Sequence, residues 1–151
     1  MAAFQYKLEV IPPEYFGESV RSSIPQEDLQ EGLTPWTHAP VPSGRFIEGL
    51  RALLPVDQSW GSSEEYCEEY VSADEGYSDL RIWQENGQVA NIEFRFTPSV
   101  SPWLLMQSFL SLVAAESYLL VETKTGHVLL PKEPNVVTRL NMLYKSFQAG
   151  I

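Results

Sequence analysis

The residues best suited to binding or catalysis lie between Arg51 and Arg81. This stretch contains eight acidic side chains and no lysine or arginine. Aromatic residues are interspersed among these carboxylates. Complementary charge accelerates the encounter with an oppositely charged protein, and Tyr and Trp supply contact energy at interfaces. We therefore predict a surface for a basic protein partner, formed by Trp60, Tyr66, Glu68, Glu69, Tyr70, Asp74, Glu75 and Tyr77. The alternative is an acidic surface that only maintains solubility.

Candidates for catalysis and metal binding are few. Cys67 is the single cysteine, and the glutamates around it should raise the pKa of its thiol and suppress the reactive thiolate. The two histidines, His38 and His127, are far apart in the sequence, and no glycine-rich phosphate loop or nucleophile elbow is present. The acids lack the spacing of a calcium loop, and zinc would need clustered Cys and His. We expect no enzymatic activity, no cofactor and no metal.

Two alternative functions remain open at this stage. The first is a small-molecule binder or enzyme with a pocket beside Trp36 and His38, which would need a carboxylate such as Glu14 or Asp79 to converge on it. The second is a homodimer or larger homo-oligomer that uses the sheet face around Trp83 as its interface. For Trp83 itself, a ring covered by a neighbouring element or by an arginine stem is the more ordinary expectation.

Charge and composition exclude several classes of partner. The chain has 151 residues, of which 44% are hydrophobic and 20% charged, which is typical of a globular protein. Its net charge of −10 resides wholly in residues 1–76, whereas residues 77–151 hold six acidic and six basic residues. Because phosphate backbones and anionic membranes attract clustered cations, we expect no nucleic-acid partner and no membrane partner. The lone cysteine and the absence of a signal-peptide pattern lead us to expect a cytoplasmic protein.

The stretch 78–96 reads as a β-hairpin around Asn86-Gly87, the strongest short-range signal for such a turn. Side chains alternate between the two faces of a strand, so both apolar sets must fall on one side. A two-residue loop at Asn86-Gly87 would instead pair Ile82 with Asn91 and put the two apolar sets on opposite faces. We therefore predict a three-residue loop, 85–87, with a bulge at Gly87, which pairs Leu80 with Ile92, Ile82 with Ala90 and Trp83 with Val89.

The remaining elements follow from apolar periodicity and from capping residues. We predict a strand over 4–11, a helix over 44–54 that Ser43 caps and Pro55 ends, a helix over 102–117, a hairpin of 118–122 with 127–131, and a helix over 135–148. The stretch 64–71 fits a strand better, because a helix would set like charges four residues apart. Between these elements, 14–42 is a Pro-rich irregular loop with one short helical turn at 26–31.

Together these elements predict a single α+β domain over 1–151. We expect a mainly antiparallel sheet of about six strands, with two or three helices packed on one face. The Pro-rich loop is not a domain boundary, because the first strand would be left without a sheet to join.

A resemblance covers residues 78–131. The run from Ser78 to Trp83 into Asn86-Gly87, the strand from Ile92 to Phe96, the apolar helix and the turn from Thr125 to Val128 resemble small bacterial proteins of uncharacterised function. Some of those proteins are similar to immunity proteins of toxin systems. The resemblance implies a bacterial cytoplasmic protein and brings no site residues with it.

Overall fold

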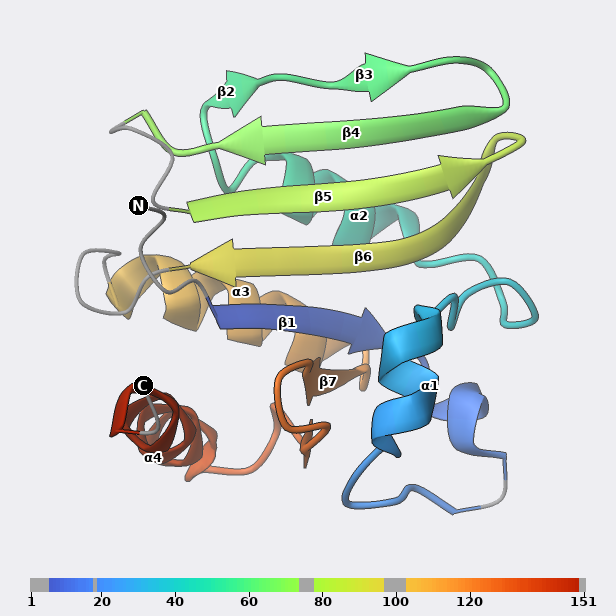
Figure 1. Cartoon of the computed structure of the whole chain (residues 1–151). Coiled ribbons are helices and arrows are strands. Elements are labelled where there is room, and N and C mark those ends of the chain that lie inside the picture. Colours follow the sequence, from blue (N-terminus) through green and yellow to red (C-terminus); the bar gives the residue numbers. More distant parts are fainter. Residues whose placement is uncertain (1–5, 18, 74–77, 97–102, 150–151) are drawn as a thin grey trace.

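The computed structural model describes residues 6–17, 19–73, 78–96 and 103–149 (Figure 1). Their strands form one eight-stranded antiparallel sheet, in the order β2-β4-β5-β6-β1-β7-β8, with the short β3 also paired to β4. The strands are β1 (Tyr6–Ile11), β2 (Val56–Asp57), β3 (Trp60–Gly61), β4 (Glu65–Val71), β5 (Ser78–Glu85), β6 (Gln88–Phe96), β7 (Leu119–Glu122) and β8 (Val128–Leu129). The helices are η1, a 3₁₀ turn (Pro13–Phe16), α1 (Gln26–Glu31), α2 (Gly44–Arg51), α3 (Trp103–Ala115) and α4 (Val136–Ala149).

The α+β class and the antiparallel sheet are confirmed, and so is each longer predicted element. The strand 64–71 is indeed β4, and the helical turn at 26–31 is α1. Ser43 caps α2, since its side chain accepts a hydrogen bond from the backbone N–H of Phe46. The prediction missed β2 and β3, which are two residues each and too short to show a period.

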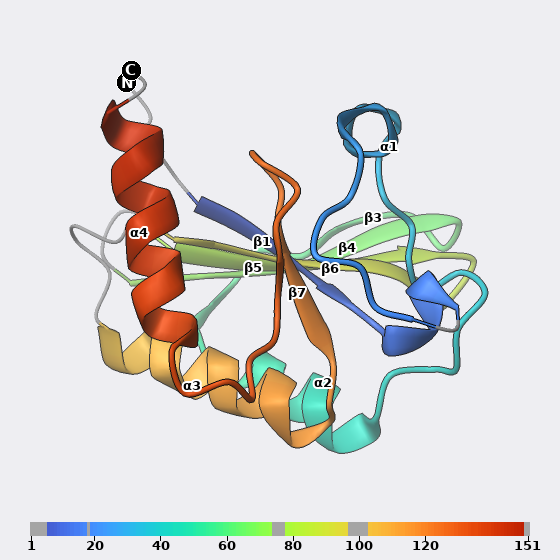
Figure 2. The same cartoon turned by 90° about the horizontal axis from the view of Figure 1, so that it is seen from below.

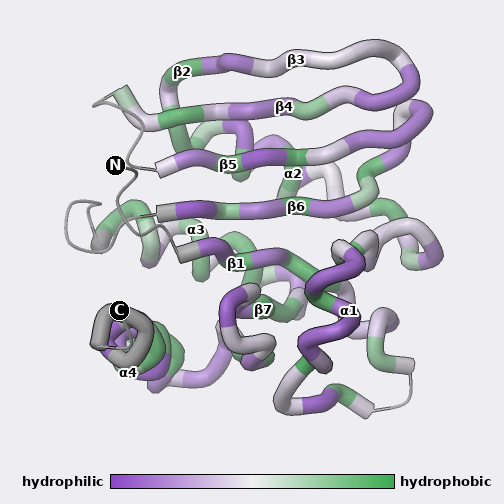
Figure 3. Tube along the Cα trace, in the orientation of Figure 1, coloured by the Kyte–Doolittle hydropathy of each residue, from purple (hydrophilic) through white to green (hydrophobic). Residues whose placement is uncertain are grey.

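The predicted helices α2 and α3 pack on one face of the sheet as expected, whereas α1, predicted only as a helical turn, lies on the opposite face. Figure 2 shows α2 and α3 against one face of the sheet and α1 on the opposite one. We call the face turned away from α2 and α3 the open face. On it, α1 lies over the end of β1 and to one side of β7, while β4 and β5 lie clear of it in Figure 1. In Figure 3, α1 is coloured mostly hydrophilic, whereas α3 carries much more hydrophobic colour.

The main core lies between the sheet and α2, α3 and α4. Leu8, Leu80 and Phe94 are wholly buried on the strand side, and Phe46 and Phe109 meet them from the helices. The rings of Phe94 and Phe109 stack with centroids 4.3 Å apart. A second, smaller core lies on the open face, between the sheet and residues 23–35, which carry α1 and which we call the α1 segment. Its buried members are Ile11, Ile24, Leu33, Leu119, Val121 and Val128.

The hairpin of β5 and β6 corrects the predicted loop. Only Asn86 and Gly87 form the turn, with φ of 51° and 80°, so both adopt the left-handed conformation of a two-residue hairpin turn. The register then shifts between Trp83 and Gln84, which leaves Ala90 as the extra residue of a bulge inside β6. Leu80 therefore pairs with Phe94, Ile82 with Ile92 and Trp83 with Asn91.

The apolar faces do meet on one side of the sheet, as the argument from alternation required. Ile82 and Ile92 face each other and both are wholly buried. The extra residue that reconciles the two strands lies in β6 rather than in the loop. A contact with the Pro-rich loop accounts for this position, because the backbone oxygen of Ala90 accepts a hydrogen bond from the backbone N–H of Trp36.

The Pro-rich loop is anchored to the sheet at several points. Trp36 is buried, and its indole Nε1 donates to the backbone oxygen of Val10 at 2.9 Å. At the other end, the N–H of Ile24 donates to the oxygen of Gly126, and Ser23 forms a bridge with His127. Gly126 has a φ of 82°, and a Cβ there would collide with the backbone oxygen of Ile24, so glycine is required.

Candidate functional site

The predicted partner surface is divided between the two faces of the sheet. In β4, Tyr66, Glu68 and Tyr70 pair with Gln84, Ile82 and Leu80, which places them on the helix side. Glu69 pairs with Arg81 and therefore lies on the open face. Asp74, Glu75 and Tyr77 lie outside the described residues. Because neighbouring strand residues point to opposite faces, Glu68 and Glu69 do not share one surface.

Glu68 is neutralised by its own surroundings on the helix side. Arg51 donates to both carboxylate oxygens, at 2.8 and 3.0 Å, and Tyr70 and Gln84 donate at 2.9 and 2.7 Å. Burial alone would raise the pKa of Glu68, but the hydrogen bonds from Arg51, Tyr70 and Gln84 hold it below its usual range. Glu68 and Tyr70 therefore support the edge of the sheet, where they join α2 to β4.

On the open face, charges pair across the central strands. Arg81 forms an ion pair with Glu69, Arg95 forms one with Asp79, and Nζ of Lys7 lies 3.4 Å from Oε1 of Glu93. Each of these carboxylates is largely buried beside its cation. This part of the face is therefore polar but nearly neutral.

An aromatic pair lies beside this neutral patch. Trp60, Cys67 and Trp83 form one row across β3, β4 and β5, and the two indoles meet edge to face with centroids 5.3 Å apart. Trp60 is 50% exposed, and Trp83 is partly covered by it, as expected for a ring beside a neighbouring element. We call Trp60, Trp83, Glu65 and Glu85 the aromatic patch.

The two carboxylates of the aromatic patch are available to a partner. Glu65 lies directly opposite Glu85 at the hairpin end of β4 and β5, and both side chains are exposed. Neither forms an ion pair with any described residue. Like charges that face each other across strands repel, so an approaching cation would stabilise this end of the sheet.

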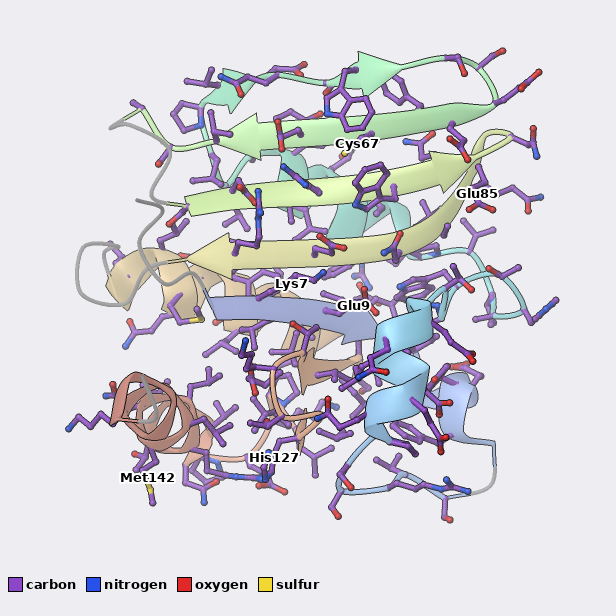
Figure 4. All side chains as sticks on the ribbon, viewed as in Figure 1. Lys7, Glu9, Cys67, Glu85, His127 and Met142 are labelled. Atoms are coloured by element: carbon purple, nitrogen blue, oxygen red, sulfur yellow. The ribbon has the colours of Figure 1, made fainter. Side chains whose placement is uncertain are left out.

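Cys67 is enclosed beneath the indoles, and Figure 4 labels it on β4. It is wholly buried, and burial above all raises the pKa of its thiol to about 12, with smaller contributions from Glu69, Glu93 and Asp79. The direction of this shift confirms the prediction, although the chief cause is burial rather than neighbouring charge. A thiol with this pKa is inert as a nucleophile at neutral pH.

The predicted pocket beside His38 exists in part. His38 and Glu14 line one cavity of about 410 Å³, together with Asp28 and Glu31 from the α1 segment. Trp36 is a buried core residue instead, and Asp79 is bound to Arg95. Among the described residues, no group of three or more His, Cys, Asp and Glu side chains could hold a metal ion.

A second cavity near α1 contains a residue that the sequence analysis did not single out. Glu9 of β1 lines a space of about 240 Å³ with Lys7, Asn91, Glu93, Thr123 and the α1 segment. Figure 4 labels Glu9 on β1, beside α1. Only 3% of Glu9 is exposed; its Oε1 accepts a hydrogen bond from Asn91, and its Oε2 has no partner among the described residues.

The electrostatics of Glu9 are unusual for a strand residue. Burial raises the pKa of its carboxyl to about 8, the Asn91 hydrogen bond opposes this rise, and the charge of Glu93 adds to it. A buried carboxyl with a strongly raised pKa in a cavity is a recognised mark of a functional site. The alternation of 4–11 placed Glu9 on the polar face, but nothing local indicated that Leu29 and Leu33 lie close to it.

Comparison with known proteins adds no relative: no protein-family model, curated protein or solved structure matches the chain. No helix in the described ranges is long and apolar enough to cross a membrane.

Proposed function

We propose that this protein is a non-enzymatic binding protein that receives a basic protein partner on the open face of its sheet, as an inhibitor or immunity protein would. The single observation that carries the proposal is the aromatic patch. It combines an edge-to-face Trp60–Trp83 pair with exposed Glu65 and Glu85, neither of which is neutralised by a described residue.

The chemistry of the aromatic patch fits arginine and lysine side chains. A guanidinium can stack on the exposed face of Trp60 while a carboxylate accepts its N–H groups. The chain's net charge of −10 attracts a basic partner from a distance and speeds the encounter. The same charge opposes a second copy of this chain, since two such acidic surfaces would repel. A basic partner is therefore favoured over a homodimer built on Trp83.

The proposal changes the role of the acidic stretch. Trp60 keeps its predicted place in the interface, whereas Glu68, Glu69 and Tyr70 hold the sheet beneath it through Arg51 and Arg81. The resemblance of residues 78–131 to bacterial proteins that include immunity-like members agrees with this function, as does a cytoplasmic location for a chain whose only cysteine is a free thiol.

A pull-down from lysate of the native cell tests the proposal. The tagged full chain is incubated at about 50 mM and about 500 mM salt, and retained proteins are identified by mass spectrometry. Because screening weakens exposed charge pairs, we expect a basic protein that binds at low salt and is released at high salt.

Variants locate the contact once the partner is purified. Trp60→Ala should weaken binding by about tenfold or more, as expected for an exposed aromatic anchor, and the double variant Glu65→Gln/Glu85→Gln should flatten the salt dependence. Glu48→Gln, which removes one exposed carboxylate on α2, serves as the control for loss of a surface charge outside the patch and should bind as the wild type does. Binding that is indifferent to salt and to both patch variants would refute the proposal.

The cavity beside His38 supports a second candidate function, small-molecule binding. The observation in its favour is that His38, Glu14, Asp28 and Glu31 meet around one space of about 410 Å³. NMR titration with a fragment library, read at the ring of His38, tests it. Shifts that Glu14→Gln removes would support this site, and a ring that no fragment perturbs would end the idea.

A further inference from the structure

Glu9 is the group that the described part of the chain leaves least satisfied. It is nine-tenths and more buried, and it is fixed at Oε1 by the amide of Asn91, 3.3 Å away. Its Oε2 is the only buried side-chain oxygen or nitrogen among the described residues that lacks a hydrogen-bond partner. Leaving such an acceptor unpaired destabilises a fold, so a ligand that donates a hydrogen bond to it would be stabilised in this cavity.

With Glu9 ionised, the charges around this cavity would be one cation short. Two carboxyl groups, Glu9 and Glu93, share the amide of Asn91, whose Nδ2 lies 3.3 and 3.4 Å from their Oε1 atoms. Lys7 is the single cation that lines the cavity, and its Nζ is already 3.4 Å from Glu93. If both carboxyls are ionised, one negative charge stays unmatched. One further monovalent cation would complete the set.

Apart from Thr123, whose hydroxyl donates to the backbone oxygen of Lys7, the remaining residues that line the cavity are apolar or glycine. Leu29 and Leu33 line it from the α1 segment, and both also belong to or pack against the small core of the open face. Gly32, between them, adds no side chain. A ligand for this space therefore needs a compact positive end that donates hydrogen bonds and a short hydrocarbon portion.

We propose that the cavity lined by Glu9, Glu93, Leu29 and Leu33 is a binding site for a primary alkylammonium group. The ammonium donates to the carboxylates of Glu9 and Glu93, and the alkyl chain packs on the two leucines. A volume of about 240 Å³ admits a chain of a few carbons. The site shares no residue with the aromatic patch, although Asn91 of the cavity pairs with Trp83 across β5 and β6, and it goes beyond the basic protein partner proposed there.

Binding at this site exchanges a proton for the amine. At neutral pH the carboxyl of Glu9 is protonated, because its pKa is about 8. An arriving ammonium favours the carboxylate, so Glu9 loses its proton to water as the ion pair forms, and charge is conserved. The other charged groups near Glu9 are Lys7 and Glu93; Tyr15, whose own pKa is raised by burial, by Asp28 and by Glu9, also interacts with it.

Calorimetric titration of the full chain with n-butylammonium chloride tests the site. We expect saturable binding that releases close to one proton at about pH 7, measured as a heat that changes with the ionisation enthalpy of the buffer. Affinity should rise up to tenfold per pH unit until about pH 8 and then level off. n-Butanol, which has the same chain without charge, should bind at least tenfold more weakly.

Variants distinguish binding at this site from non-specific attraction of the amine to an acidic protein. Glu9→Gln is isosteric with the protonated carboxyl, so the protein should stay folded while losing both the proton release and at least tenfold in affinity. Glu48→Gln should bind the amine as the wild type does. No binding of n-butylammonium to the wild type, or equal binding to Glu9→Gln, would overturn the proposal.

The source of the amine is resolved by a parallel titration with Nα-acetyl-lysine amide. Binding of both probes points to a lysine side chain as an acceptable ligand, and binding of n-butylammonium alone points to a free amine; either result supports the site. Trp60→Ala should leave both titrations unchanged, so that a failure of the aromatic patch and a failure of the amine site are told apart.

Discussion

Two buried glutamates of this sheet are stabilised in opposite protonation states. Glu68 has four donated hydrogen bonds, two of them from Arg51, and its pKa lies below the usual range. Glu9 has one hydrogen bond and a pKa of about 8. Burial acts on both in the same direction, so the difference comes from the donors that reach each carboxyl.

The raised pKa of Glu9 predicts how stability depends on pH. In the unfolded chain this carboxyl ionises near its ordinary pKa of 4.5, whereas the folded protein keeps it protonated until about pH 8. The free energy of unfolding should therefore fall as pH rises from about 4.5 to about 8 and level off above, by at most about 1.4 kcal/mol per pH unit.

Glu9→Gln should remove this component. In urea titrations between about pH 5 and about pH 8, the wild type should lose roughly 3 kcal/mol more than the variant does. Because the other titrating groups are the same in both proteins, their contributions to the free energy of unfolding cancel in the comparison. One of them is Glu68, whose lowered pKa contributes stability that is lost in acid. Parallel pH profiles for the two proteins would contradict a buried, protonated Glu9.

At the scale of elements, Trp36 is the anchor that orders the Pro-rich loop. Its indole donates to Val10 and its backbone N–H to Ala90, so one residue joins the loop to β1 and to the bulge of β6. Its ring also meets Tyr118 edge to face, with centroids 5.0 Å apart.

Trp36→Phe should destabilise the protein by about 2–4 kcal/mol. The substitution leaves the oxygen of Val10 without its indole donor and opens space in the core. Trp60→Phe makes the same chemical change at a half-exposed ring and should cost less than about 1 kcal/mol. Chemical denaturation of both variants measures the difference, and equal losses would show that Trp36 is not an anchor.

The sequence was sufficient for elements whose signal is local and insufficient where distant segments decide. Apolar periodicity and capping residues located β4, α2 and the hairpin of β5 and β6 correctly. Alternation also required one extra residue between Trp83 and Ile92. Its position at Ala90 rather than Gly87 depends on the Pro-rich loop, whose Trp36 N–H meets Ala90, and no local pattern encodes that contact.

The candidate sites follow the same division. Alternation along β4 places Glu68 and Glu69 on opposite faces of the sheet. The sequence alone could therefore have predicted that the proposed partner surface is split between two faces. The burial of Glu9 was not, because it depends on Leu29 and Leu33 coming to rest near β1 from a stretch that reads as irregular.

For the molecule as a whole, the strand order determines how far apart in the sequence the paired residues are. β4, β5 and β6 are neighbours in sequence and in the sheet, whereas β1 lies between β6 and β7. Leu8 thus pairs with Phe94 on one side and Glu122 on the other. Because closing long loops slows folding, we expect the β4–β6 meander to form first and β1 to join late.

Pulsed hydrogen exchange during refolding tests this order. Amides paired between β4 and β5 should be protected before those paired between β1 and β7, and the indole N–H of Trp36 should be among the last. Simultaneous protection of all strands would indicate one concerted step instead.

The position of β1 has a consequence for the chain as it leaves the ribosome. Residues 1–76 carry a net charge of −10, and the arginines that pair with Glu69 and Asp79 are synthesised after them, at positions 81 and 95. Until then the nascent chain is a polyanion whose first strand has no partner. Its self-repulsion keeps that exposed strand from pairing with neighbouring chains, so the acidic half of this protein acts as its own protection during synthesis.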